Sequence, residues 1–320
     1  MTTQMKAYTQ AELQKRLGEP TAVRFTSLVD LAAKRCRLWE ERTVLGAAEW
    51  AAANRKRAGG PVLGARCLGS TVITDAVLGE RAGLASPASF GPADQKKGGE
   101  ALIDCYTRGK DVVTRWKGLA GAGIGLATAL GLAPGVMDFK AAGLEAAGGD
   151  REVELEVATP ALSRLLIGID DTDTRESGAT WALARKVTEG IEDMAVLSVR
   201  VVQLFPGVPT KTTNCVATLV EGAVAPWMKE AVKIEVRDRV EAMSTSGEPG
   251  VAFAEGLVFP RWEEIAGFAG RARRGIVSGD DAMDAARAVG AQVALDGRGL
   301  IGAVASLGAA DMGPEAADLG

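Results

Sequence analysis

The spacing of apolar residues divides the chain into a first half of mixed character and a second half where strands and helices alternate. Helical spacing is evident at Leu28, Leu31, Ala32, Arg35, Leu38 and Trp39. We therefore expect helices over 8–17 and within 22–57. Gly59-Gly60-Pro61 is a strong break, strand character returns over Val62–Ile73, and 80–99 has the prolines and glycines of a loop. This half is predicted to be a mixed α/β or mainly helical domain.

The second half has a clearer pattern. Leu165–Ile169 is a short apolar run that suits a buried strand, and Ala179–Ile191 suits a helix with Ser177 as its N-cap. Further strands are expected at Val196–Leu204, Asn214–Val220, Gly250–Phe259 and Gln292–Leu295, and helices at Pro226–Met243, Trp262–Ala269, Ala282–Ala288 and Gly299–Leu307. This alternation predicts an α/β or α+β sheet domain.

A domain boundary is expected near 150–160. Gly143–Asp150 consists mostly of small residues and suits a linker, and Glu152–Val157 alternates charged and apolar residues as an exposed edge strand does. We therefore divide the chain of 320 residues into domains 1–155 and 156–320.

Composition excludes several kinds of chemistry. The chain has no histidine, and its four cysteines form no CxxC pair. Zinc sites of Cys and His, and Ser-His-Asp or Cys-His nucleophile systems, are therefore not expected. The net charge of −4 argues against nucleic acid as a partner, although short basic clusters occur at 54–57 and 271–274.

The hydrophobic pattern predicts a cytoplasmic protein. Met1–Gln14 is polar, so no signal peptide is expected. Leu119–Met137 is the most apolar stretch, but its dense glycines favour a buried helix or a glycine-rich loop over a membrane span.

The main chemical feature is an acidic run that follows the apolar strand ending in Gly168-Ile169. Asp170, Asp171 and Asp173 crowd three carboxylates together with Thr172. Such crowding is costly unless a cation neutralises it, and Mg²⁺ often bridges one or two carboxylates to substrate phosphates. The amides of the following helix, around Ser177, Gly178 and Thr180, are expected to face a phosphate. The alternative is an Asp-rich turn that only caps the helix.

Two basic motifs are candidates for contacting the same anion. Lys211 follows the stiff segment Phe205–Thr210, and Arg298 lies between Gly297 and Gly299. Arginine matches phosphate geometry bidentately. Each motif has an ordinary alternative as a turn with a solvated cation. Cys215 and Trp181 are expected to be buried core residues.

These motifs together resemble a known family. The order of Gly168-Ile169-Asp170-Asp171-Thr172-Asp173, a Pro-x-x-Pro-x-Lys-Thr segment ending at Thr212, and Gly297–Gly302 is similar to that in the archaeal tRNA-isoleucine agmatinylcytidine synthetase. This resemblance covers roughly 163–310. It implies an ATP-dependent kinase-like domain with a ferredoxin-like unit. The motif lies at the N-terminus of the synthetase but deep in this chain, so nucleotide chemistry carries over better than tRNA specificity.

A second resemblance is closer in detail. The variant from Ile169 to Trp181 is similar to methanogenesis marker protein 11. That resemblance implies an archaeal protein that acts in making or maturing a component of methane metabolism.

The sequence therefore predicts an ATP- and Mg²⁺-dependent phosphotransferase or ligase-like enzyme. Asp170, Asp171 and Lys211 are the expected catalytic residues, and Asp173 completes the metal set. Nucleotide contacts are expected from Gly168, Thr172, Ser177, Gly178, Thr180 and Arg298. The N-terminal domain would supply specificity for an unknown acceptor, such as a protein of methane metabolism. Two alternatives stay open, namely an accessory factor that binds nucleotide without turnover and a tRNA-modifying enzyme.

Overall fold

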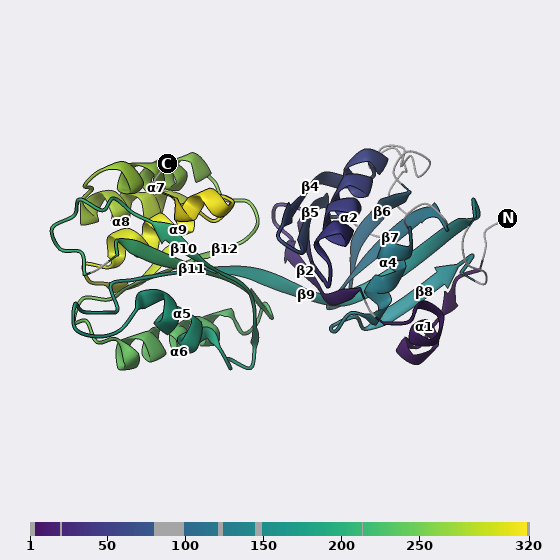
Figure 1. The fold of residues 1–320 in the computed structure, drawn as a ribbon, viewed down its shortest axis with the longest axis horizontal. Coiled ribbons are helices and arrows are strands. Elements are labelled where there is room, and N and C mark those ends of the chain that lie inside the picture. Colours follow the sequence, from purple (N-terminus) through teal and green to yellow (C-terminus); the bar gives the residue numbers. More distant parts are fainter. Residues whose placement is uncertain are drawn as a thin grey trace. The chain divides into compact units, whose positions relative to one another are not determined.

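One long strand, β9 (Glu152–Asp170), contributes to both halves of the chain (Figure 1). The computed structural model describes residues 4–19, 21–79, 99–120, 124–144, 149–212 and 214–318. The chain divides into two units, Met1–Leu162 and Ser163–Gly320. The expected boundary between 155 and 156 thus falls within β9 rather than in a linker. Both units mix helices and strands, which confirms the predicted α+β class.

The N-terminal unit is built around the first half of β9. Its strands are β1 (Lys6–Ala7), β2 (Ala22–Asp30), β3 (Arg35–Arg42), β4 (Val62–Leu68), β5 (Thr71–Val77), β6 (Glu100–Arg108), β7 (Asp111–Leu119) and β8 (Asp138–Ala142). β9 pairs antiparallel with β7 on one side and β8 on the other. The prediction of an exposed edge strand at Glu152–Val157 is therefore wrong. Its alternating charges pair across strands instead, as in Lys117–Glu152 at 3.1 Å.

The prediction of a helix within 22–57 is confirmed, but the helix inferred from the spacing at Leu28 to Trp39 is wrong. β2 and β3 form an antiparallel hairpin, and only α2 (Leu45–Ala58) is helical in that region. The turn is set by Asp30, whose side chain accepts the amide of Ala33 at 2.9 Å, and by Lys34 at a φ of 51°. Phe25 to Leu28 are all buried, so the strand lacks the polar-apolar alternation that would have identified it.

The remaining helices of this unit are short. They are α1 (Gln10–Leu17), α4 (Ile124–Ala129) and the 3₁₀ turn η2 (Leu130–Leu132). The described part of Leu119–Met137 therefore holds a buried helix, as predicted. Among the described residues, no helix is long and apolar enough to cross a membrane. Most of the loop predicted at 80–99, and half of the predicted linker 143–150, lie outside the described residues.

The C-terminal unit contains an antiparallel sheet in the order β10-β11-β9-β12-β13. Its other strands are β10 (Met194–Gln203), β11 (Val216–Val224), β12 (Gly250–Glu255) and β13 (Gln292–Asp296). Helices α5 (Thr180–Thr188) and α6 (Lys229–Met243) complete the succession β9-α5-β10-β11-α6-β12. This βαββαβ succession, with β12 and β11 on the two sides of β9, is ferredoxin-like.

Helices cover both faces of this sheet (Figure 1). Apolar residues of α5 and α6 pack on one face, with Ile167 and Ile169 of β9. The opposite face is covered by α7 (Trp262–Arg274), α8 (Gly279–Val289) and α9 (Leu300–Gly308), and η3 (Pro314–Ala317) follows. The ferredoxin-like element thus comes from residues 163–255. The Gly297–Gly302 motif lies outside it, at the start of α9, which belongs to the additional helical layer of α7, α8 and α9.

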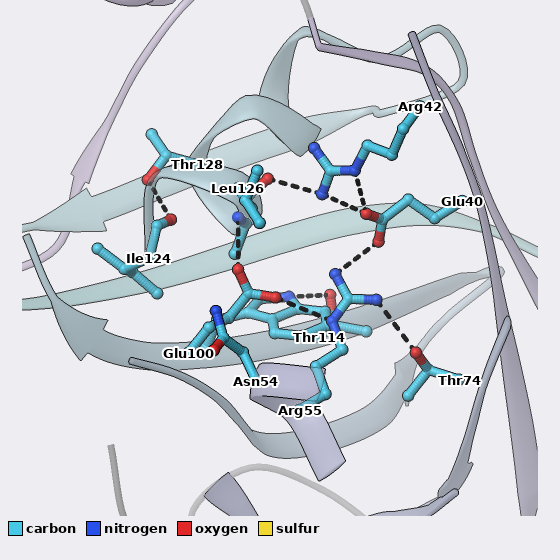
Figure 2. A network of polar contacts seen from close by, with 12 residues as sticks. Glu40, Arg42, Asn54, Arg55, Thr74, Glu100, Thr114, Ile124, Leu126 and Thr128 are labelled. Atoms are coloured by element: carbon cyan, nitrogen blue, oxygen red, sulfur yellow. Dashed lines mark hydrogen bonds and ion pairs between the residues drawn. The ribbon is translucent and has the colours of Figure 1, made fainter. Parts of the chain in front are cut away.

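The interior of the N-terminal unit contains a network of buried charges (Figure 2). Arg55 of α2 donates to Glu100 at 2.9 Å and to Glu40 at 2.6 Å, and its guanidinium lies 4.5 Å from the ring centroid of Trp116. Glu40 also pairs with Arg42. Glu100 in turn accepts the amide of Ala127 in α4 at 2.9 Å. Each charge therefore has an opposite partner, and the network ties α2 and α4 to three strands.

Removing the centre of this network should strongly destabilise the N-terminal unit. Arg55→Ala would leave Glu100 buried without its counter-charge, and such losses cost about 3–5 kcal/mol. Arg66→Ala is a matched control, because Arg66 pairs with Asp75 on the surface of the same unit, where a pair contributes about 0–1 kcal/mol. Urea unfolding followed by tryptophan fluorescence would measure both variants. Equal effects would show that the network does not stabilise this unit.

Candidate functional site

A pocket lies beside the C-terminal end of β9, within the C-terminal unit. Its volume is about 190 Å³. Its walls come from the acidic loop (residues 171–179), the lysine loop (205–212 and 214–215), the α7–α8 connection and the arginine loop (297–299). Segments far apart in the sequence therefore converge on the end of one strand.

Asp170 lies against the first turn of α9. A Cβ added at Gly302 would stand 1.8 Å from the Asp170 carboxylate, and one added at Gly299 would stand 2.4 Å from the Asp170 carbonyl oxygen. Glycine is therefore required at both positions for this packing. Burial raises the pKa of Asp170 well above its usual range, and the charges of Asp171 and Asp173 raise it further, against the lowering effect of the Asp171 amide.

Asp171 and Arg298 form the main ion pair of the site. Nε of Arg298 donates to one carboxylate oxygen at 2.5 Å and Nη2 donates to the other at 3.1 Å. This fork geometry is the strong form of such a pair. Asp171 has a φ of 52°, in the left-handed region that few residues other than glycine adopt. The hydrogen bonds from Arg298 to Asp171 also raise the pKa of Arg298.

The rest of the acidic loop is tied together by hydroxyl groups. Thr180 Oγ1 accepts the Thr172 amide at 3.2 Å and donates to Asp173 at 3.3 Å. Thr212 of the lysine loop donates to the other Asp173 oxygen at 3.4 Å. Asp173 therefore joins the acidic loop to the lysine loop. Thr172 is buried and outside the pocket lining, so its hydroxyl acts within the loop.

Helix α5 begins at the pocket without a side-chain cap. Its N-cap is Ala179, so the prediction that Ser177 caps this helix is wrong. Ser177 is exposed, and its carbonyl accepts the Thr174 amide at 2.8 Å. Gly178, at a φ of 92°, makes the turn into the helix. The first amides of a helix lack intrahelical partners, and here Ala179, Thr180 and Trp181 line the pocket.

Trp181 was predicted to be a core residue, and this prediction is wrong. Its side chain is 51% exposed on the pocket wall. The apolar wall formed by Ile276 and Val277 of the α7–α8 connection was not predicted from the sequence. A tryptophan in the first turn of a helix that follows a glycine-containing acidic loop was the signal available for Trp181. No pattern in the sequence pointed to Ile276.

Lys211 lies on the exposed side of the pocket. Among the described residues it has no ion-pair partner. Cys215 lies further along the same loop and is partly exposed rather than buried as predicted. Burial and the Asp170 charge raise the pKa of the Cys215 thiol, and Lys211 lowers it.

Seven of the predicted site residues line this pocket. They are Asp170, Asp171, Asp173, Gly178, Thr180, Lys211 and Arg298. Gly168, Thr172 and Ser177 do not line it. A Cβ at Gly168 would stand 2.0 Å from the Ala303 carbonyl oxygen, so this glycine serves the packing of α9. Within the described chain, no three His, Cys, Asp or Glu side chains converge as a ready metal site, so the predicted metal set stays a prediction.

Comparison with known proteins places the chain among archaeal relatives. It is 35% identical to the uncharacterized protein MJ0921 of Methanocaldococcus jannaschii over 215 residues, which cover 66% of this chain and 70% of that protein. The chain belongs to the family of this protein. Membership of the methanogenesis marker protein 11 family stays a prediction.

The site region has a second set of relatives. A family model described as the TiaS TCKD domain matches residues 166–232. The chain is 32% identical to the tRNA-isoleucine 2-agmatinylcytidine synthetase TiaS of Pyrococcus horikoshii over 152 residues, 45% of this chain and 35% of the synthetase. The chain thus spans about a third of that relative. The predicted resemblance of the C-terminal half to this synthetase is confirmed.

Two solved structures are also similar over the same share of the chain. A crystal structure of TiaS in complex with its tRNA and ATP matches at 25% identity and a TM-score of 0.42. A complex of TiaS with its tRNA, AMPCPP and agmatine matches at 25% identity and a TM-score of 0.39. Each covers 47% of this chain and 37% of the synthetase chain.

The raised pKa of Asp170 implies that the free energy of unfolding depends on pH. Because its folded pKa lies above the unfolded value of about 3.9, ionising Asp170 reduces the free energy of unfolding. This loss is absent below about pH 4 and grows as the pH rises through the folded pKa. Asp170→Asn should therefore raise the melting temperature near pH 7–8, and the difference from wild type should shrink towards pH 4.

Thermal unfolding between pH 4 and pH 8 would measure this effect. Asp284→Asn is the matched control, because Asp284 is exposed on α8 and substitution there should stay within about 0.5 kcal/mol. A stabilisation that does not depend on pH, or a destabilised Asp170→Asn variant at pH 7, would show that the buried charge of Asp170 does not reduce stability.

Proposed function

We propose that the C-terminal unit binds ATP with Mg²⁺ and that the protein is an ATP-dependent ligase-like or phosphoryl-transfer enzyme. The observation that carries the proposal is the convergence in one pocket of Asp170, Asp171, Lys211 and the uncapped start of α5. Anions bind readily where helix amides and a cation converge. The sequence similarity to TiaS, which is named as a synthetase and crystallised with ATP, supports the same chemistry.

The residues present are compatible with a magnesium ion. Mg²⁺ needs only one or two protein carboxylates, because water and phosphate oxygens complete its octahedron. Asp170 and Asp171 would hold it. Asp170 is a suitable ligand because burial disfavours its charge, and a bound cation would relieve that cost. Bound Mg²⁺ would neutralise charge on the phosphates.

The other side chains would bind and orient the nucleotide. The amides of Thr180 and Trp181 would donate to phosphate oxygens, and Lys211 would offset negative charge on the transferred group. Arg298 is paired with Asp171, so it would contact the phosphates only when another cation, such as Mg²⁺, takes its place beside Asp171. Phosphoryl transfer depends mainly on positioning and electrostatics, so it needs no histidine. The apolar wall with Trp181 and Ile276 suits the nucleobase.

The acceptor would be activated by phosphorylation of a carbonyl or amide oxygen, which is the chemistry that the resemblance to the synthetase implies. The γ-phosphate would move to that oxygen and ADP would leave. A role in maturing a component of methane metabolism is a finer hypothesis that rests on the sequence resemblance alone.

A tRNA-modifying enzyme is the second candidate, and the charges around the pocket favour it. Lys211 lines the pocket, Arg175 lies in the acidic loop, and Arg271 and Arg274 flank the lining residues Ala272 and Gly275. In the described chain these four cations make no ion pair, whereas most other cations of this unit do. A polyanionic acceptor would meet no competing carboxylate of the described residues at these cations.

Nucleotide titration tests the leading proposal. Isothermal titration with a non-hydrolysable ATP analogue should give micromolar binding, roughly −8 kcal/mol, that requires Mg²⁺. The double variant Asp170→Asn, Asp171→Asn should fold and lose this binding, while Asp284→Asn should retain it. Unchanged binding in the double variant would exclude the acidic loop as the site. If the wild type binds ATP but does not turn it over with any acceptor that is tried, the alternative of an accessory factor that binds nucleotide without turnover is favoured.

A glycine variant tests the position of Asp170 without changing any charge. Gly302→Ala would place a Cβ 1.8 Å from the Asp170 carboxylate and force that side chain to move. We expect loss of Mg²⁺-dependent binding by at least about tenfold, since one lost charged contact is worth about 1.5–3 kcal/mol. Gly267→Ala on α7 is the matched control, because its nearest neighbour would be an arginine nitrogen at 4.0 Å. Equal binding by both variants would remove Asp170 from the site.

The tRNA alternative has a salt-dependent test. If the pocket rim binds RNA, a gel shift should weaken with salt, and Arg175→Ala or Arg274→Ala should each reduce the salt slope by about 1. Lys186→Ala is the control, because Lys186 is an exposed cation on α5 outside the pocket lining. Equal slopes for all three variants would argue against RNA at this rim.

A further inference from the structure

The segment between α6 and β12 contacts both charged loops of the site without lining the pocket. We call it the brace, and it consists of Ser244, Thr245, Ser246, Gly247 and Glu248. Asp171 and Arg298 come from loops 127 residues apart in the sequence, yet they meet at 2.5 Å. The arginine loop packs on the end of β9 through Gly299 and Gly302. In addition, the brace makes hydrogen bonds to both loops.

On one side the brace holds the acidic loop. The carbonyl oxygen of Thr172, the residue after Asp171, accepts the Thr245 amide at 2.9 Å and lies 3.3 Å from the Thr245 hydroxyl. The same hydroxyl lies 3.3 Å from the Ser177 carbonyl oxygen. Thr245 thus contacts both ends of the acidic loop and limits its movement. Asp171 is held in its left-handed conformation between these contacts and β9.

On the other side the brace holds the arginine loop. The carbonyl oxygen of Glu248 accepts the Gly299 amide at 3.0 Å, and its side chain accepts the Arg298 amide at 3.2 Å. A Cβ at Gly297 would stand 2.5 Å from the Glu248 carbonyl carbon, so the two backbones are in direct contact. Glu248 therefore fixes the backbone from which the Arg298 side chain reaches Asp171.

We propose that the brace is the positioning element of the nucleotide site, and that Thr245 and Glu248 set the spacing at which Arg298 meets Asp171. This inference rests on the proposed function for its role in binding. Neither residue touches the nucleotide pocket. They act through Asp171 and Arg298, which do.

The first test needs no ligand. In ¹⁵N-labelled protein, the Arg298 Nε–H signal, assigned by its absence in Arg298→Lys, should exchange slowly with water because Asp171 accepts it. Thr245→Val and Glu248→Ala should each speed this exchange. Thr245→Ser keeps the hydroxyl and Glu248→Gln keeps a side-chain acceptor oxygen, so exchange in these two variants should remain slow. Unchanged exchange in both Thr245→Val and Glu248→Ala would overturn the proposal.

The second test connects the brace to binding. Thr245→Val and Glu248→Ala should each weaken Mg²⁺-dependent binding of the ATP analogue by roughly two- to tenfold, the effect of one lost hydrogen bond. In an Arg298→Ala background, Glu248→Ala should add nothing, because it acts through Arg298. Glu241→Ala, at an exposed position on α6, is the control and should bind as wild type does.

An additive effect of Glu248→Ala in the Arg298→Ala background would overturn the positioning role and leave the proposed function standing. If the wild type binds no nucleotide, the proposed function fails, and the exchange measurement alone decides whether the brace sets the ion pair.

Discussion

The close approach of α9 to the end of β9 is the constraint on which the site depends. It is possible only because the contact positions lack side chains. A Cβ at Gly168 would stand 2.0 Å from the Ala303 carbonyl oxygen, and one at Gly250 would stand 2.0 Å from the Gly299 carbonyl carbon. These contacts are with backbone, which cannot move aside as a flexible side chain can. The glycines therefore bring the arginine loop, the end of β9 and the start of β12 together, which places Arg298 within reach of Asp171.

The same packing reduces the free energy of unfolding, because it places unfavourable groups at the site. It encloses Asp170, whose pKa rises as a result, and it holds Asp171 at a positive φ. Sites of this kind are typically less stable than the rest of the fold, because function and stability favour different residues. The buried network of the N-terminal unit contrasts with it. There Arg55 has an acidic partner for each side of its guanidinium, so burial of the charges is balanced within the network.

The sequence predicted what depends on local pattern. The apolar run before Asp170 predicted a buried strand, and the glycine-flanked Arg298 was singled out as a candidate anion contact. Features that depend on tertiary contacts were missed. The hairpin of β2 and β3 is buried on both faces and so has no alternation to read. Glu152–Val157 has the alternation of a half-exposed strand, but the pattern does not distinguish an edge strand from a central one.

The candidate site was likewise predictable where residue type and local pattern identify it, and not where it depends on tertiary contacts. The acidic run is recognisable by residue type, because three crowded carboxylates are costly unless a cation neutralises them. Lys211 was singled out as the one cation of a stiff, proline-containing segment. Glycine suits both close ligand approach and close helix packing, so residue type alone does not show which role Gly168 has. The contact with Ala303 shows that it serves helix packing. Thr245 and Glu248 have no distinctive pattern at all, since their partners lie 73 and 50 residues away.

A crystal structure of the protein with a non-hydrolysable ATP analogue and Mg²⁺ would show directly whether the pocket beside β9 binds the nucleotide. We expect the phosphates to lie against the first turn of α5 and Lys211, with the metal on Asp170 or Asp171 and the base along the wall that contains Trp181. A nucleotide bound elsewhere in the chain, or one whose phosphates point away from the acidic loop, would contradict this expectation.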